Sequence, residues 1–411
     1  MQEEQSTHYA QPEEPSQNGS FLEVLSVFTR LGLTSFGGPV AHLGYFRTEL
    51  VERRKWVDDQ SYADIVALCQ FLPGPASSQV GIAMGLGRAG MRGALAAWLG
   101  FTLPSAIVLI IFAYGVGNLA GVADSAWLNG LKIVAVAVVA QAVWGMARTL
   151  APDKPRATIA ILAAIGVLAW QSPFMQIGVI IAAGAIAWRF FPKAALLPHK
   201  PMSFSLSRQT GVAALAIFGG LLFGLPLIRP LIASETFAIF DSFFRTGSLI
   251  FGGGHVMLPL IQAEVVPPGW VTNENFIAGY GAAQAIPGPL STFAAYLGTI
   301  MDAGPGGWMG GTIALIAIFV PSFLLVIGVL PFWEGLRARQ WVQSALIGIN
   351  AAVVGILLAA LYDPVWTSAI HRPADFGLGL VAFGLLVFWK LPPWMVVLFT
   401  AAGATALAQV T

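Results

Sequence analysis

Long apolar segments separated by short polar stretches follow one another through almost the whole chain. Several exceed the roughly 20 residues that one helical crossing of a bilayer needs, and a few fall short of it. This pattern predicts an all-α polytopic membrane protein. The apolar segments cover about residues 21–50, 62–88, 93–118, 124–149, 157–171, 173–191, 210–229, 235–263, 275–301, 308–332, 341–361, 376–389 and 392–409.

The same motif interrupts two of these segments. Residues 70–78 read QFLPGPASS, and residues 284–292 read QAIPGPLST. Two prolines around a glycine remove backbone donors and cannot continue a helix. Such a break leaves unpaired backbone groups at membrane depth, which is tolerable only where protein or a polar cavity covers them. We therefore expect broken helices that line an ion-handling site.

The two motifs belong to an internal duplication with an offset of 214 to 217 residues. Matched arginine, glutamate, glutamine and tryptophan residues in one order are not expected by chance. The sequence therefore predicts two homologous halves, at residues 21–207 and 208–411. Matched positions include Arg30 with Arg245, Glu49 with Glu264, Trp56 with Trp270, Gln70 with Gln284, Ser77 with Ser291, and Pro104 and Ser105 with Pro321 and Ser322.

Basic residues predict that the two halves are inverted relative to each other. The loop at residues 47–60 contains four lysines and arginines, whereas its counterpart at residues 262–273 contains none. By the positive-inside rule the first loop is cytoplasmic and its counterpart is external. Residues 1–20 are polar and acidic and lack the basic start and apolar core of a secretory signal, so we expect a disordered cytoplasmic tail.

The broken segments are too short to cross the membrane on either side of the break. Residues 62–88 divide into arms of about 11 and 13 residues, each spanning ~16–20 Å against ~30 Å of hydrocarbon. A re-entrant hairpin fits this segment better than a full crossing, and residues 21–50, interrupted at Phe36 to Pro39, are interpreted in the same way. The scheme has five full crossings from 93 to 229 and four after 305, with full crossing by the broken segments as the alternative.

The composition of the chain limits the classes of partner and cofactor that we expect. Hydrophobic residues make up 56% of the chain and charged residues 10%, against roughly 25% charged residues in a soluble domain, so the lipid bilayer is the surrounding medium. A net charge of +1 gives no reason to expect a nucleic-acid partner. The single cysteine, Cys69, excludes an internal disulfide and a multi-cysteine metal cluster, and we expect neither metal nor cofactor. The sequence leaves open whether the chain forms a homo-oligomer.

The duplicated motifs carry a resemblance to a known family. FTRLGLTSFGGPVAHLGYF at residues 28–46 pairs with FFRTGSLIFGGGHVMLPLI at residues 243–261, and each is followed by Trp-Val and then by Q-x-x-P-G-P. This arrangement resembles the chromate ion transporter family in its long, two-domain form. The resemblance implies a secondary transporter in the bacterial inner (plasma) membrane that exports chromate from the cytoplasm and confers chromate resistance. The GGP of the first half stands against GGGH in the second, which leaves room for unequal contributions.

Chromate is a tetrahedral divalent oxyanion, so its site needs positive potential and hydrogen-bond donors without a carboxylate alongside. Arginine suits oxyanions, and an ionisable group at membrane depth marks a pathway more often than a surface anchor. The breaks supply free N–H groups and positive helix ends. Flanking amides and hydroxyls could replace part of the hydration shell or satisfy the carbonyls freed by the break. The predicted substrate-binding residues are Arg30, Gly37, Gly38, Gln70, Pro73, Gly74, Pro75, Ser77, Ser78, Arg245, Gly252, Gly253, Gly254, Gln284, Pro287, Gly288, Pro289, Ser291 and Thr292.

Other readings of these residues stay open. His255, Glu49 and Glu264 are candidates for proton coupling, although glutamates at segment ends are also typical solvated or capping groups. Sulfate has nearly the shape and charge of chromate, and nothing in these residues separates the two ions. The chain is not expected to be an enzyme, because it contains no H-E-x-x-H or G-x-S-x-G motif and its five histidines are scattered.

Overall fold

The computed structural model describes residues 19–36, 38–118, 126–170, 173–191, 206–250, 257–337 and 339–410, and these are predominantly helical with no β-strand. The predicted all-α class is confirmed. The first half comprises α1 (Phe21–Thr34), α2 (Gly38–Phe46), α3 (Asp59–Phe71), α4 (Ala76–Asn118), α5 (Ala126–Leu150), α6 (Lys154–Ala169) and α7 (Pro173–Phe190). After α8 (Arg208–Ile228) come α9 (Glu235–Leu249), α10 (Met257–Val265), α11 (Asn273–Ala283), α12 (Phe293–Ile300), α13 (Gly307–Val329), α14 (Trp333–Arg337), α15 (Gln340–Ala360), α16 (Pro373–Val387) and α17 (Pro393–Val410).

The duplication extends to the residues that start the helices. The Ser20 hydroxyl accepts a hydrogen bond from the first turn of α1, and the Ser234 hydroxyl, within one position of the equivalent place, does the same for α9. Asp58 and Thr272 cap α3 and α11 in equivalent positions. Each side chain satisfies an N–H group that the helix leaves without an internal partner. The repeat is therefore preserved in local structure where the residue types differ.

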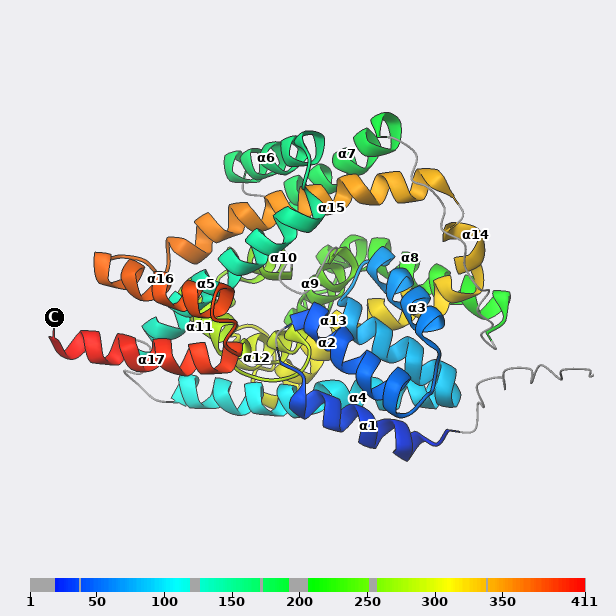
Figure 1. The fold of residues 1–411 in the computed structure, drawn as a ribbon, viewed down its shortest axis with the longest axis horizontal. Coiled ribbons are helices and arrows are strands. Elements are labelled where there is room, and N and C mark those ends of the chain that lie inside the picture. The colour runs from blue at the N-terminus through cyan, green and yellow to red at the C-terminus, as the bar shows by residue number, and fades with distance from the viewer. Residues whose placement is uncertain are drawn as a thin grey trace, which may run out of the picture.

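Equivalent helices of the two halves run in opposite directions. The repeat matches α5 with α15, and Figure 1 shows that these two helices extend in opposite senses along the long axis. The last part of α4, after a kink at Ala89 and Gly90, is likewise opposed to α13. Helix α8 has no described equivalent in the first half and adds one crossing between the halves. An odd number of crossings turns the second copy over, so the predicted inverted topology is confirmed.

The broken segments form re-entrant hairpins, as predicted. Arg88, at the end of the first part of α4, lies 5.3 Å from the centre of the Trp56 ring, which precedes α3, and pairs with Glu23 of α1 at 3.1 Å. The beginning and the end of the hairpin are therefore on the same side. In the second half the Asp302 N–H donates to the Trp270 carbonyl at 3.1 Å, which brings the start of α11 and the end of α12 together in the same way.

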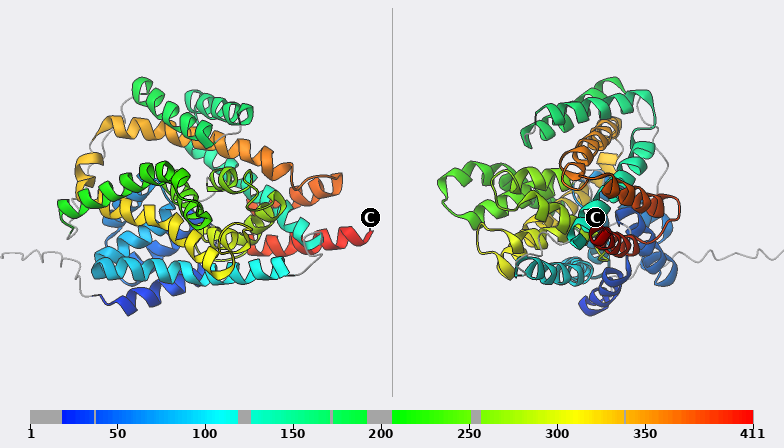
Figure 2. Two further views of the ribbon diagram at one scale, coloured as in Figure 1. Left: turned by 180° about the vertical axis from the view of Figure 1, so that it is seen from behind. Right: turned by 90° about the vertical axis from the view of Figure 1, so that its left-hand side faces the viewer.

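Among the described residues, five helical segments are long and apolar enough to cross a membrane: those at α4, α5, α8, α13 and α15. The four other predicted crossings are shorter apolar helices; α6 and α16 have 16 and 15 residues, which corresponds to about 24 and 22 Å. These short helices pack across the repeat, because α15 contacts α6 and α7 while α5 contacts α16 and α17. Both views in Figure 2 show α6 and α7 lying over α15. The helix pair α6 and α7 of the first half therefore packs against the second half, and the pair α16 and α17 packs against the first.

Candidate functional site

The two Pro-Gly-Pro loops are bonded to each other's half. The Gly74 N–H donates to the Ile250 carbonyl at the end of α9, at 2.6 Å. The Gly288 N–H donates to the Ser35 carbonyl at the end of α1, at 3.0 Å. These bonds join repeat-equivalent positions, and each links a hairpin from one side of the membrane to a hairpin from the other. Both loops therefore lie where the two halves meet.

Both loop glycines are needed for the backbone conformation and for close packing. Their φ angles are +132° at Gly74 and +106° at Gly288, a region that L side chains rarely adopt. A Cβ on Gly74 would lie 3.0 Å from the Ser322 hydroxyl, and one on Gly288 would lie 2.7 Å from the Ser105 hydroxyl. Each loop thus rests on the Pro-Ser pair of the opposite half.

Several buried polar side chains in and around these loops have no hydrogen-bond partner among the described residues. The Ser291 and Ser322 hydroxyls are completely buried, and the Ser78 hydroxyl belongs to a residue with 3% exposure. A buried donor without a partner costs about 1–3 kcal/mol, so such groups cluster where a ligand, ion or water completes them. The full set is Ser35 Oγ, Ser78 Oγ, Gln79 Oε1, Thr102 Oγ1, Gln284 Nε2, Ser291 Oγ and Ser322 Oγ.

Helix beginnings give the loops a positive potential. The helix α4 begins at Ala76, directly after the first loop, and a 3-10 turn at Leu290–Thr292 followed by α12 begins after the second. The first N–H groups of a helix have no internal partner and carry the positive end of its dipole. Residues 70–80 and 284–300 contain no aspartate or glutamate. The loops therefore present donors and positive potential without a local carboxylate.

His42 is a residue of this region that the sequence analysis did not select. It is 1% exposed, its Nδ1 lies 3.2 Å from the Ser77 hydroxyl, and its ring meets Phe101 edge to face. Its counterpart by the repeat is the apolar Met257, so the duplication gave no signal for it. Ser105 and Ser322 were also missed, although their recurrence as Pro-Ser pairs in apolar segments could have identified them.

Arg245 lies in an ion-pair network. Its guanidinium contacts both carboxylate oxygens of Glu264, each at 2.7 Å, and both of Asp241, at 3.0 and 3.1 Å. Arg229 also contacts Asp241 at 3.1 Å, and Ser242 donates to Glu264 at 2.9 Å. Asp241 is completely buried, so its charge must be balanced nearby, and Arg229 and Arg245 are the cations that pair with it in the described part of the chain.

Arg30 has a different environment from its counterpart. Its side chain is exposed, and no carboxylate among the described residues forms an ion pair with it. Glu49 pairs instead with Arg54 at 2.8 Å and Arg53 at 3.1 Å. Burial raises the pKa of the Glu49 carboxyl, but the hydrogen bond with Arg54 and the charges of Arg54, Arg53 and Arg30 outweigh burial and hold the pKa below its ordinary value.

The remaining predicted residues have different environments. Gln70 is exposed on α3, and the Thr292 hydroxyl donates to the Pro289 carbonyl at 2.8 Å, which satisfies a carbonyl freed by the break. The Gln79 amide donates to the Pro73 carbonyl at 2.7 Å in the same manner. Gly38 has a positive φ of 80° at the start of α2. Gly37, Gly252, Gly253, Gly254 and His255 lie outside the described residues.

Comparisons with known proteins agree with this two-half organisation. The sequence model of the chromate transporter family matches residues 22–188 and 237–406, on either side of α8. The chain is 26% identical to a chromate transport protein of Pseudomonas aeruginosa, over 93% of this chain and 91% of the relative. It is 25% identical to a probable chromate transport protein of Synechococcus elongatus, over 93% and 95% of the two chains.

An uncharacterised transporter of Methanocaldococcus jannaschii is 27% identical over 84% of this chain and 85% of the relative. No solved structure matches the chain significantly. The family match covers both halves and extends over most of the chain, and the three relatives described here match 84–93% of it. On these grounds this multi-pass membrane protein belongs to the chromate transporter family.

Proposed function

We propose that the protein is a secondary transporter that exports chromate from the cytoplasm and thereby confers chromate resistance. Family membership and the names of two full-length relatives support chromate as the substrate. The observation that carries the proposal is the bonding of each Pro-Gly-Pro loop to the opposite half, because buried donors without partners among the described residues lie in and around both loops. A tetrahedral dianion would complete these donors from several directions.

The substrate site comprises the two loops, the hydroxyls beside them and the adjacent helix beginnings. Chromate presents four oxygens, each able to accept hydrogen bonds, and the buried Ser78, Ser291 and Ser322 hydroxyls belong to different elements and to both halves. The absence of carboxylates in the loop segments favours an anion over a cation or a neutral solute. The predicted residues Gly74, Gly288 and the flanking prolines act here by shaping the loops rather than by contacting the ion through side chains.

The direction of transport follows from charge and potential. The basic loops around residues 47–60 and 148–156 are cytoplasmic by the positive-inside rule, which also places the N-terminus in the cytoplasm of a cell bounded by the inner (plasma) membrane. Moving two negative charges out of a cell that is negative inside releases about 4.6 kcal/mol at 100 mV. Potential alone is therefore sufficient to drive export. Glu49 and Glu264 are both held in ion pairs, which disfavours them as proton carriers.

A transport assay with matched serine variants tests the proposal. Purified protein in liposomes should take up radiolabelled chromate faster than empty liposomes, in proportion to an imposed potential. Ser291→Ala should lower uptake about tenfold while leaving thermal stability unchanged, because its hydroxyl has no described partner to lose. Ser344→Ala is the control, since this buried hydroxyl donates to the Gln340 carbonyl within α15, away from the loops. Uptake no faster than in empty liposomes would refute the proposal.

Sulfate is the second candidate substrate, because it shares the shape and charge of chromate. The names of the Pseudomonas and Synechococcus relatives refer to chromate and give no support to sulfate. Competition between the two ions in the same liposomes decides the matter. Chromate uptake that a hundredfold excess of sulfate leaves intact supports chromate selectivity, and equal inhibition by equal concentrations supports a general tetrahedral oxyanion transporter.

A further inference from the structure

The duplication supplies two matched arginines, but the structure leaves only one of them available to an anion. Arg245 has Asp241 four residues earlier on α9, and the two side chains are paired at 3.0 Å. Arg30 has Ser26 in the same position on α1. One substitution between the halves therefore removes the carboxylate that would neutralise Arg30.

Glu49, the second carboxylate that could pair with Arg30, binds other residues. Glu264 binds Arg245 through both oxygens, whereas its counterpart Glu49 binds Arg53 and Arg54. Between Glu49 and Trp56 the first half reads Leu-Val-Glu-Arg-Arg-Lys. Between Glu264 and Trp270 the second half reads Val-Val-Pro-Pro-Gly. The first half thus brings its own arginines to Glu49, and Arg30, although its charge still acts on Glu49 from further away, forms no ion pair among the described residues.

We propose that Arg30 and the hydroxyl groups beside it form the site that captures the dianion from the side of the first-half hairpins, whereas Arg245 is a structural ion pair that closes the other side. This inference rests on the proposed transport of chromate and deepens it. By the positive-inside rule the capture side is cytoplasmic. The two halves then have different roles despite their common fold.

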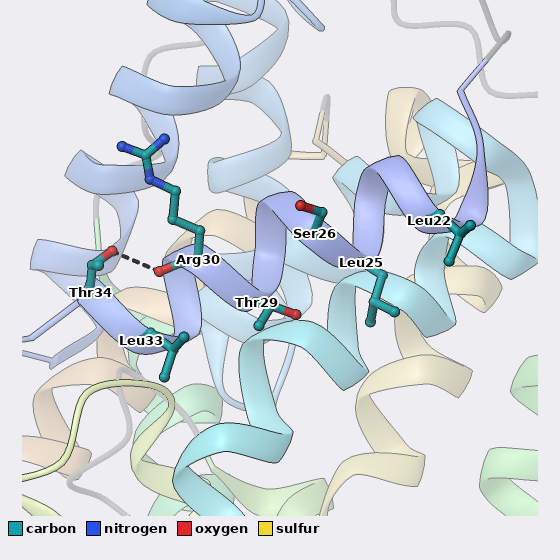
Figure 3. Close-up of a pocket in the computed structure, with 7 residues that line it drawn as sticks. All are labelled: Leu22, Leu25, Ser26, Thr29, Arg30, Leu33 and Thr34. Atoms are coloured by element: carbon teal, nitrogen blue, oxygen red, sulfur yellow. Dashed lines mark hydrogen bonds between the residues drawn. The ribbon is translucent and has the colours of Figure 1, made fainter.

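The surroundings of Arg30 fit an anion. An open pocket of about 640 Å³ runs along one face of α1 and is lined by three leucines and by Ser26, Thr29, Arg30 and Thr34. Figure 3 shows Ser26 and Arg30 on the same side of α1, with the guanidinium extended away from the helix. Ser26, Arg30 and Thr34 follow one another at intervals of four residues, which aligns them along one face. This polar stripe ends directly beside Ser35, whose carbonyl binds the second loop.

The corresponding face of the second half is covered. Helix α8 packs against α9, where Phe218 and Phe244 have ring centres 6.2 Å apart and Arg229 reaches Asp241. No described helix covers α1 in the equivalent way, so its polar stripe is open. A charged side chain at membrane depth is stable only beside water, a partner or a substrate path. The exposed Arg30 therefore indicates an aqueous vestibule.

The distance from this vestibule to the loops is short. Arg30 precedes Ser35 by five residues, which corresponds to about 7.5 Å along the helix axis. An anion held by Arg30 is thus close to the positive helix beginnings at the loops. A fixed charge that attracts the dianion to the mouth of the site raises its local concentration and speeds its association.

Ser26→Asp tests the inference by restoring the missing carboxylate. An aspartate four residues before Arg30 reproduces the Asp241–Arg245 pair, and the exposed position of Ser26 tolerates the change. A carboxylate about 6 Å from a dianion repels it by roughly a tenfold change in affinity even in a water-like dielectric. The KM for chromate in liposomes should therefore rise about tenfold or more in Ser26→Asp, and several-fold less in Ser26→Asn, which adds a side chain of about the same size without the charge.

A double variant separates neutralisation of Arg30 from damage elsewhere. Arg30→Gln alone should raise the KM, and adding Ser26→Asp to it should have a smaller effect than adding Ser26→Asp to the wild type. A wild-type KM in Ser26→Asp overturns the inference while leaving chromate transport intact, as does an equal loss in Ser26→Asn. Wild-type protein that transports no chromate overturns the inference together with the proposed function.

Discussion

Replacing Gly288 by alanine adds a single carbon atom, the Cβ, at the contact between the two halves. The new Cβ would lie 2.7 Å from the Ser105 hydroxyl and 3.2 Å from the Phe101 carbonyl oxygen. The φ of +106° adds a backbone penalty of about 1–2 kcal/mol for a residue with a Cβ. Moving Ser105 away would break its hydrogen bond to the Thr102 carbonyl, at 3.0 Å, which is worth about 1 kcal/mol. The free energy of unfolding should therefore fall by about 2–4 kcal/mol.

Gly269→Ala is the matched control, because Gly269 has a φ of +77° but no atom within 4 Å of its added Cβ. It should show the backbone penalty alone, about 1–2 kcal/mol. Unfolding of the purified proteins in detergent, followed by intrinsic tryptophan fluorescence, measures both values, and liposome uptake measures the effect on transport. If Gly288→Ala were no less stable than Gly269→Ala and transported chromate at the wild-type rate, the close approach of the loop to the opposite half would be wrong.

Two further predictions concern packing and charge. Asp241→Asn should lower the free energy of unfolding by about 3–5 kcal/mol, measured by denaturation in detergent, because it leaves Arg229 without its counter-charge and Arg245 with Glu264 in place of two carboxylates, and a loss below 1 kcal/mol would contradict the network. Gly247→Ala should destabilise the fold by about 1–3 kcal/mol, since its Cβ would overlap the Ile318 carbonyl of α13, whereas Gly224→Ala on α8, with open space around it, should be neutral or stabilising in the same assay.

The main elements of the fold could be predicted because they depend on local motifs, segment lengths and residue counts, which are visible in the sequence alone. The helix-breaking motifs, the lengths of their arms and the asymmetry of basic residues are each readable without contacts, and they sufficed for the inverted halves and re-entrant hairpins. The four short apolar segments were also predicted at nearly their observed lengths, since α6, α7, α16 and α17 begin and end within three residues of the predicted bounds. A hydrophobic pattern thus locates these helices, although it does not show that they are short relative to a bilayer.

The site could be predicted only in part, because partner choice depends on atoms far apart in the chain. Both loops were identified, but nothing local indicates that Gly74 binds the Ile250 carbonyl of the other half. Matched residues were expected to have matched roles, yet Arg30 and Arg245 differ because of neighbours that the repeat does not preserve. His42 has no polar counterpart and was visible only through its contact with Ser77. The assignment of substrate contacts to individual residues stays a prediction.

An inverted duplication has a physical consequence for direction. Two halves related by a two-fold axis in the membrane plane, joined by reciprocal bonds at Gly74 and Gly288, would present the same surface to both sides. Such a protein could conduct an anion but could not distinguish inside from outside except through the membrane potential. Any preference built into the chain must come from the parts that break the symmetry. Those parts include α8, which covers α9 and has no described counterpart over α1, and the exchange of Asp241 for Ser26, which leaves Arg245 in an ion pair and Arg30 without one among the described residues.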